Sequence, residues 1–288
     1  MVAACASPSH GTQLASDETY ALWADAQNAY WIDKAGVLKA AALTGGDPMI
    51  LASRITGDLV GDDDALYVSQ QAGSGAELMR IAKADGSAAT IAAFGATRLA
   101  LAGDTLVGTT MTGQPFALSL GTGAVQMFPG EPKGWYIPDV AVDGTNMYWN
   151  EDMPFMGARS CVVQPLTGVP SHVLPGCGNL DLTAADGYVF SVSRVEQESI
   201  PDTGMSVNRH DVTSADERIV ATGELPRFPA VVGGRLYWAF ATSIERSKLA
   251  GADRLTLAVT DGYPSALAVS AAAVVWSTPS GIWAVDLH

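Results

Sequence analysis

The chain has little positive charge, and this scarcity excludes several classes of protein. Its 288 residues include 16 lysines and arginines against 30 aspartates and glutamates, which gives a formal net charge of −14. A surface that binds nucleic acid needs clustered Lys and Arg, so we expect no nucleic-acid partner. Charged residues make up only 16% of the chain and hydrophobic residues 48%. Because an average soluble domain has roughly 25% charged residues, this composition also excludes a disordered chain and a charged coiled coil.

Long hydrophobic runs and helical periodicity are absent as well. No uninterrupted apolar stretch approaches the roughly 18 residues of a membrane-spanning helix. No window repeats its apolar residues with the period of an amphipathic helix. The length is sufficient to bury a substantial core, so we expect an all-β globular fold.

Cysteine occurs only three times. The segment Val2-Ala3-Ala4-Cys5 is similar to the end of a bacterial lipoprotein signal, whose cysteine is acylated after cleavage. The basic and apolar segments that precede such a motif are missing, so a chance match is the alternative. We expect residues 1–11 to be a tether or signal remnant, and lipidation of Cys5 to be the only membrane attachment.

Cys161 and Cys177 flank a predicted β-hairpin. Strands over 161–166 and 171–175, joined by a turn, place the two cysteines at the same open end of the hairpin. A disulfide there closes a loop of about 16 residues, nominally worth about 3 kcal/mol. The alternative is a pair of free thiols in a reducing cytosol. A disulfide and a cell-envelope location support each other.

A repeat of about 40 residues runs along the chain. Each unit has a short apolar segment, a turn, an anchor pair of large apolar residues, a third strand and a short fourth strand. Four short strands per 40 residues is the period of a β-propeller blade. The anchor pairs, which we expect to form the core between blades, are Tyr30-Trp31, Tyr67-Val68, a degenerate Val107-Gly108, Tyr148-Trp149, Val189-Phe190, Tyr237-Trp238 and Val275-Trp276.

The seventh unit ends after its third strand, and the N-terminal region can supply the fourth. Residues 12–16 are similar to the fourth-strand segment 49–53, and pairing them with 281–287 would close the ring and cover a bare edge. The sequence therefore predicts a seven-bladed β-propeller over residues 12–288, with four antiparallel strands per blade. Six blades are the alternative if the degenerate unit is misread.

The anchors also resemble known propeller repeats. Tyr30-Trp31-Ile32-Asp33, Tyr148-Trp149-Asn150-Glu151 and Tyr237-Trp238-Ala239-Phe240 look like the Tyr-Trp-Thr-Asp repeat and are similar to repeats of bacterial envelope proteins of the TolB/NHL-like group. That group includes receptors, scaffolds, and a few lyases and hydrolases. The resemblance therefore implies a fold and an envelope location, but hardly narrows the function.

Three long loops are expected to meet on one rim, over blades 4 and 5: residues 128–138, which lead into blade 4, residues 150–159 in blade 4, and residues 193–205 in blade 5. Long loops on a rigid scaffold commonly carry binding or catalytic residues. The alternative is a solvated rim without a site. The candidate ligand-binding residues there are Trp135, Tyr136, Arg159 and Arg194, and the candidate catalytic carboxylates are Glu151, Asp152 and Glu198.

A second group of polar residues is expected around the mouth of the central channel. One position before the innermost strand, successive blades offer Asp58, Arg98 and Asp139, with Asn179 and Arg227 roughly equivalent in the next two. Charges of alternating sign indicate ion pairs between blades, and a polar binding ring is the alternative.

Enzyme signatures are otherwise few. The four histidines, His10, His172, His210 and His288, are not placed at the channel mouth by the repeat, so neither a Ser-His-Asp triad nor a histidine metal site is expected. We expect no metal and no cofactor; a cation bound in the channel is the alternative.

The sequence favours a monomeric binding or interaction module of the cell envelope, in the periplasm, on the outer surface or secreted. Its partner would be a small molecule or an envelope protein. A lyase or hydrolase that uses the loop carboxylates is the alternative.

Overall fold

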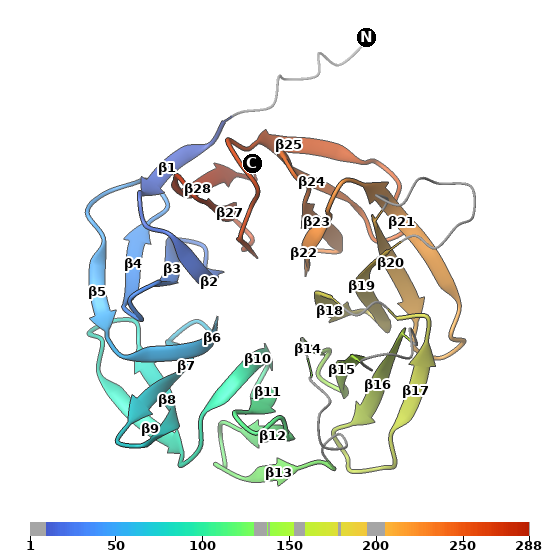
Figure 1. The fold of residues 1–288 in the computed structure, drawn as a ribbon, viewed down its shortest axis with the longest axis horizontal. Helices are drawn as coiled ribbons and strands as arrows, with labels where there is room; N and C mark the ends of the chain where they lie inside the picture. Colours follow the sequence, from blue (N-terminus) through green and yellow to red (C-terminus); the bar gives the residue numbers. More distant parts are fainter. Residues whose placement is uncertain are drawn as a thin grey trace.

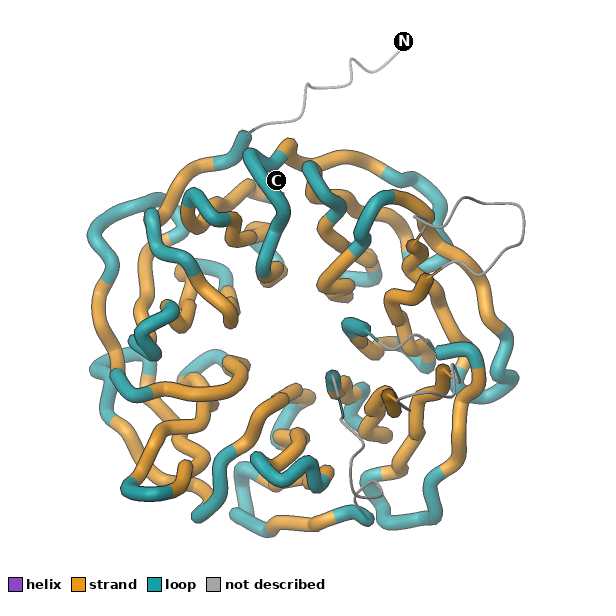
Figure 2. Tube along the Cα trace, viewed as in Figure 1, coloured by secondary structure: helices purple, strands orange, loops and turns teal. Residues whose placement is uncertain are grey.

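The computed structural model describes residues 10–129, 137, 139–152, 159–177, 180–194 and 205–287. Within them the chain forms 28 strands in seven four-stranded antiparallel sheets, which surround a central axis (Figure 1). These residues contain strands and loops but no helix long and apolar enough to cross a membrane (Figure 2). The chain is a seven-bladed β-propeller, as the repeat predicts.

Six blades are each formed by four consecutive strands. Blade 1 comprises β2 (Thr19–Ala24), β3 (Asn28–Asp33), β4 (Leu38–Ala42) and β5 (Met49–Ala52). Blade 2 comprises β6 (Ile55–Gly61), β7 (Ala65–Ala72), β8 (Gly75–Ala82) and β9 (Ala88–Ala92). Blade 3 comprises β10 (Ala96–Ala102), β11 (Thr105–Thr110), β12 (Pro115–Ser119) and β13 (Val125–Met127).

The next three blades follow the same order. Blade 4 comprises β14 (Val140–Val142), β15 (Asn146–Asp152), β16 (Arg159–Pro165) and β17 (His172–Pro175). Blade 5 comprises β18 (Leu182–Ala185), β19 (Tyr188–Arg194), β20 (Met205–Asp211) and β21 (Glu217–Gly223). Blade 6 comprises β22 (Arg227–Val232), β23 (Arg235–Ala239), β24 (Ser243–Lys248) and β25 (Leu255–Val259).

Blade 7 joins the two ends of the chain. Its strands are β26 (Ala266–Val269), β27 (Ala273–Thr278), β28 (Gly281–Asp286) and, as the outermost, β1 (Thr12–Ala15). β1 runs antiparallel to β28, with Thr12 opposite Ala284 and Ala15 opposite Ile282 (Figure 1). The predicted closure by an N-terminal strand is confirmed.

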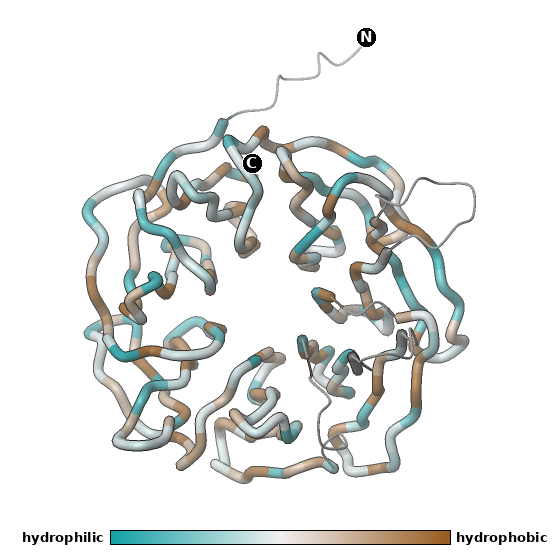
Figure 3. The backbone as a smooth tube through the Cα atoms, viewed as in Figure 1, coloured by the Kyte–Doolittle hydropathy of each residue, from teal (hydrophilic) through white to brown (hydrophobic). Residues whose placement is uncertain are grey.

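The hydrophobic core lies between the blades. The buried residues divide into seven clusters, each of which joins two neighbouring blades, and hydrophobic residues recur around the whole ring (Figure 3). The anchor tryptophans fill these clusters: Trp31 and Trp238 are 0% exposed, and Trp276 is 1% exposed. Their regular recurrence therefore reflects packing between blades and not a ligand stack.

Blade 3 fills its degenerate anchor from the opposite strand. Phe116 in β12 lies directly opposite Gly108, is fully buried, and packs edge-on against Phe94 with ring centroids 5.0 Å apart. A Cβ at position 108 would lie 2.3 Å from the backbone oxygen of Arg98 and 2.9 Å from the Phe116 ring. The aromatic ring therefore takes the space of the anchor side chain, and glycine is required beside it.

We expect Gly108→Ala to destabilise the protein. Because the nearest atom is backbone, β10 must shift, and overpacking of this kind costs about 1–3 kcal/mol. The matched control is Gly75→Ala in β8, where the nearest atom to a new Cβ is the Ala72 oxygen at 4.0 Å. Urea unfolding of both variants measures the difference, and equal midpoints for them would contradict this packing.

The predicted disulfide is present. Cys161 in β16 and Cys177, two residues after β17, are bonded with their Cα atoms 5.4 Å apart, and both are fully buried. The bond ties the outer hairpin of blade 4 to the connection that leads into blade 5.

Candidate functional site at the mouth of the central channel

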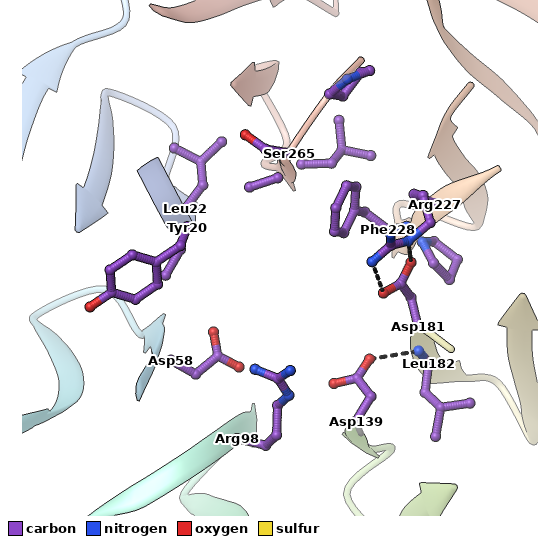
Figure 4. A pocket seen from close by; sticks show the side chains of 15 residues that line it. Tyr20, Leu22, Asp58, Arg98, Asp139, Asp181, Leu182, Arg227, Phe228 and Ser265 are labelled. Carbon is purple, nitrogen blue, oxygen red and sulfur yellow. Dashed lines mark hydrogen bonds and ion pairs between the residues drawn. The ribbon is translucent and has the colours of Figure 1, made fainter. Parts of the chain in front are cut away.

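A cavity of about 520 Å³ lies at one end of the central channel. The first strands of blades 1, 2, 3, 5, 6 and 7 contribute to its wall, together with the connections that lead into blades 4, 5 and 7 (Figure 4). The volume falls in the range of roughly 300–1,000 Å³ typical of small-molecule sites. Its lining residues are Tyr20, Ala21, Leu22, Asp58, Arg98, Asp139, Asp181, Leu182, Arg227, Phe228, Pro229, Pro264, Ser265, Ala266 and Leu267.

β-Bulges occur where several of these side chains meet the channel. The pairing register shifts between Thr19 and Ala21 in β2, between Thr56 and Leu59 in β6, and between Arg227 and Ala230 in β22. A bulge adds a residue on one strand and re-aims the neighbouring side chains. Tyr20, Asp58 and Phe228 lie at these register shifts, which direct their side chains toward the cavity.

Carboxylates tie successive blades together at the mouth. Asp58 accepts a hydrogen bond from the N–H of Leu99 in blade 3, at 3.4 Å. Asp139 accepts one from the N–H of Leu182 in blade 5, at 2.7 Å. Asp58 and Asp139 each also accept the N–H of the residue that follows them. Asp58 and Asp139 thus link neighbouring blades by hydrogen bonds and also form part of the cavity wall.

Asp181 forms the ion pair at the mouth. Its two oxygens accept hydrogen bonds from Nε and Nη2 of Arg227, at 2.6 and 3.1 Å, and one of them also accepts the N–H of Phe228 at 2.9 Å (Figure 4). A bidentate guanidinium–carboxylate pair is directional, and its charge-assisted hydrogen bonds are stronger than those between neutral groups. It therefore fixes Arg227, whose guanidinium lies 4.7 Å from the centre of the Phe228 ring.

Asp139 is a strongly perturbed acid of the group. Burial, together with the carboxylates of Asp181 and Asp58, raises its pKa to about 8, while the N–H of Leu182 and the guanidinium of Arg98 act in the opposite direction. Burial also raises the pKa of Asp58, against which Arg98 acts. Because the pKa of Asp139 lies above 7, this carboxyl is mostly protonated at neutral pH. A perturbed acid in a cavity is typical of functional sites.

Asn150 holds the backbone of Asp139 in place. It is 0% exposed, accepts the N–H of Asp139 at 2.9 Å, and donates to the carbonyl oxygen of Leu180 in the connection to blade 5. Asp139 is thus positioned by a buried amide as well as by its own hydrogen bonds.

Backbone strain accompanies the site in blade 6. Leu225 and Phe228, which flank Arg227, have φ values of +49° and +55°. This left-handed conformation disfavours residues with a side chain, and such strain concentrates at functional positions.

The structure brings four of the predicted channel residues together, namely Asp58, Arg98, Asp139 and Arg227. Asn179, the fifth, lies outside the described residues. The blade-5 position is held by Asp181, which sequence reasoning missed. The signal was present, because Asp181-Leu182 precedes its strand in the same way as Asp139-Val140. Tyr20 and Ser265 were also missed.

The predicted rim residues are placed only in part. Trp135, Tyr136 and Glu198 lie outside the described residues. The other four lie in strands that are longer than expected, so the connection in blade 4 is shorter than the predicted Asn150–Arg159 loop. Those four are Glu151 and Asp152 in β15, Arg159 opposite Asp152 in β16, and Arg194 at the end of β19.

None of the histidines in the described ranges lines the cavity. His210 in β20 is fully buried, and its Nε2 lies 2.9 Å from the hydroxyl of Ser191. Burial lowers the pKa of His210 to about 4. Across the described ranges, no group of three or more His, Cys, Asp and Glu residues could hold a metal ion.

His210 predicts a loss of stability in acid. In the unfolded chain its pKa is near 6.5, so below that pH the unfolded state binds a proton that the native state does not. Stability from this residue falls as the pH drops from 6.5 to about 4, by about 3 kcal/mol in all. Urea unfolding of His210→Gln at pH 7 and pH 4.5 should show a smaller acid loss than the unmodified chain. The exposed His172→Gln is the control, and equal acid losses in all three would contradict the prediction.

Comparisons with known proteins identify the fold and no family. No family model and no curated sequence matches the chain. Among solved structures, it is similar to PorZ, a surface component of the type-IX secretion system of Porphyromonas gingivalis, with 12% identity, a TM-score of 0.68, and coverage of 96% of this chain and 38% of PorZ. The chain thus spans less than half of PorZ.

Two further similar structures are of about the same length as this chain. BamB from Moraxella catarrhalis has 13% identity and a TM-score of 0.55, with 95% of this chain and 98% of BamB covered. The WD40 domain of Neurospora crassa Pan2 has 10% identity and a TM-score of 0.67, with 96% and 95% covered. At these identities the similarity establishes the β-propeller architecture alone.

Proposed function

We propose that the chain is a monomeric binding protein of the bacterial cell envelope, which holds its ligand in the mouth of the central channel. The observation that carries the proposal is the cavity of about 520 Å³. Its wall combines charged groups in fixed positions with apolar residues, as binding sites do. The rim of blades 4 and 5, with Trp135, Tyr136, Arg159 and Arg194, would extend this surface.

The disulfide supports the location outside the cytoplasm. Such bonds form and persist in oxidising compartments, which include the bacterial periplasm and cell surfaces. The similarity to PorZ, which is a bacterial surface component, points the same way. Lipidation of Cys5 would then be the means of attachment, and an envelope protein is the second class of partner.

A bulky side chain at the mouth tests the binding function. Ser265 is exposed and lines the cavity, so Ser265→Trp should fill part of it, although the variant also loses the hydroxyl that lies 2.8 Å from that of the buried Ser277. A ligand at 100 times its dissociation constant stabilises the fold by about 2.7 kcal/mol. Compounds that stabilise the unmodified chain in a thermal-shift screen should bind at least about tenfold more weakly to Ser265→Trp.

Ser87→Trp is the matched control, because Ser87 is an exposed residue between β8 and β9 on the opposite face. Loss of binding in both variants, or in neither, would place the site elsewhere.

A lyase or hydrolase is the second candidate, and the raised pKa of Asp139 favours it because a protonated carboxyl can act as a general acid. The catalytic carboxylates would be Glu151, Asp152 and Glu198 on the adjacent rim. If a turnover is found, Glu151→Ala and Glu198→Ala should each reduce it strongly, and retained turnover in both removes these residues from the mechanism.

A further inference from the structure

The wall of the channel-mouth cavity has two chemically different halves (Figure 4). Blades 2 to 5 contribute three carboxyl groups and one guanidinium. Blades 6, 7 and 1 contribute mainly apolar surface, and the only charge among them is the guanidinium of Arg227. The apolar members are Ala21, Leu22, Phe228, Pro229, Pro264, Ala266 and Leu267. A ligand that contacts both halves must carry a polar head and an apolar body.

Acids outnumber bases in the polar half, and the bases are directed at two of the acids. Arg227 binds Asp181 through two hydrogen bonds. The guanidinium of Arg98 points toward Asp58 in Figure 4, and it favours the charged forms of both Asp58 and Asp139. Among the described residues, no side-chain cation forms an ion pair with Asp139, and the donors to its carboxyl group are the backbone N–H groups of Val140 and Leu182.

A cation is the head group that this arrangement fits. An anionic head would face three carboxyl groups, and its best partner, Arg227, is already bound to Asp181. Each oxygen of Asp139 accepts one hydrogen bond and has a further lone pair for another donor. An ammonium group supplies three donors, and its positive charge favours the carboxylate form of Asp139.

We propose that the cavity binds an organic cation, with an ammonium group on Asp139 and an aromatic or alkyl body against Phe228, Pro264 and Leu267. This inference rests on the proposed binding function and names its ligand class. The ligand can be a free amine or a lysine side chain of a partner, because both present the same ammonium group on an apolar stem.

Binding should release a proton. Asp139 is faced by Asp58 from β6, Arg98 from β10, Asp181 ahead of β18 and Arg227 from β22. Their combined effect with burial keeps Asp139 protonated at pH 7, and an ammonium ion beside it favours the carboxylate. Asp139 then releases its proton to the buffer, so nearly one proton should be released for each amine that binds at pH 7. Affinity should rise about tenfold from pH 7 to pH 9, as Asp139 ionises without the ligand.

The head group is tested with three probes that share one aromatic body: phenethylamine, phenethyl alcohol and phenylacetate. We expect phenethylamine to bind at least about tenfold more tightly than the other two in calorimetric titrations. Ethylamine, which has the same head without the ring, tests the apolar half and should bind more weakly than phenethylamine. A lysine-containing tripeptide, compared with its acetyl-lysine form, distinguishes a side-chain source from a free amine.

Proton release is measured on the unmodified chain by titrating phenethylamine in two buffers of different ionisation enthalpy. Asp139→Asn should abolish the release and weaken binding at least about tenfold. Asp63→Asn, which removes an exposed carboxylate from the turn between β6 and β7, should leave both unchanged. Because the release is read without any substitution, the result does not depend on how well the Asn variant folds.

The outcomes separate this inference from the binding function. Tighter binding of phenylacetate, or amine binding without proton release, overturns the cation at Asp139 and leaves the cavity as a binding site. If no probe binds and Ser265→Trp alters nothing in the screen, both proposals fail.

Discussion

Removal of residues 1–16 should lower the free energy of unfolding by about 4 kcal/mol. The deletion takes away β1, whose Leu14 is 5% exposed and belongs to the cluster between blades 7 and 1. Burial of a leucine is worth about 2 kcal/mol, and each hydrogen bond to β28 contributes about 1 kcal/mol. The edge of β28 would also be exposed to pairing with other chains, so we expect the shortened protein to self-associate.

Two controls accompany this deletion. Removal of residues 1–9 alone leaves β1 in place and should change stability little. Leu14→Ala keeps the backbone pairing and should cost about 2–3 kcal/mol. Urea unfolding and light scattering give the two readouts. An unchanged unfolding midpoint after deletion of residues 1–16 would contradict the closure of the ring by this strand.

Removal of the disulfide is the second large effect. We expect the double variant Cys161→Ala, Cys177→Ala to lose about 3 kcal/mol, because an open loop of this length gives the unfolded chain more conformational freedom. Both cysteines are fully buried in the cluster between blades 4 and 5, so the loss of packing adds to this.

Reduction provides the control for this effect. Dithiothreitol should lower the midpoint of the unmodified chain toward that of the double variant and leave the variant unchanged. The connection to blade 5 carries Asp181 four residues after Cys177, so the double variant should also bind channel ligands more weakly. Equal midpoints for the oxidised chain and the double variant would show that the bond contributes nothing to stability.

Much of the candidate site followed from the repeat alone. Asp58, Arg98 and Asp139 were found because each stands one position before a short apolar segment of the inner strand, and the repeat carries that position from blade to blade. Asp181 was missed because the inner strand of blade 5 begins at Leu182, two residues later than the Asn179 alignment assumed. A misplacement of two residues is small for the fold, yet it changes which side chain reaches the channel.

The apolar half of the cavity gave no comparable signal. Phe228 and Leu267 are 39 residues apart, about one repeat, but hydrophobic residues stand near this position in most blades, so the spacing does not single them out. They meet with Pro264 because blades 6 and 7 are neighbours in the ring. The bulge in β22 and the positive φ of Phe228 are backbone features that the residue types do not indicate. Gly108 was recognised as a degenerate anchor, but its partner Phe116 became apparent only from the strand register.

The sequence by itself determined the blade number, the closing strand and the pairing of Cys161 with Cys177, because each of these depends on spacing along the chain. Strand length and turn position are local properties, and forty residues suffice to specify one blade. Only the tertiary structure decided which charged groups at the channel mouth pair with one another and which carboxyl group is protonated. Whether Asp139 is paired or protonated depends on burial and on Asp58, Arg98, Asp181 and Arg227, which come from four other blades. Electrostatic free energy depends on distance in space, and the ring closure sets those distances.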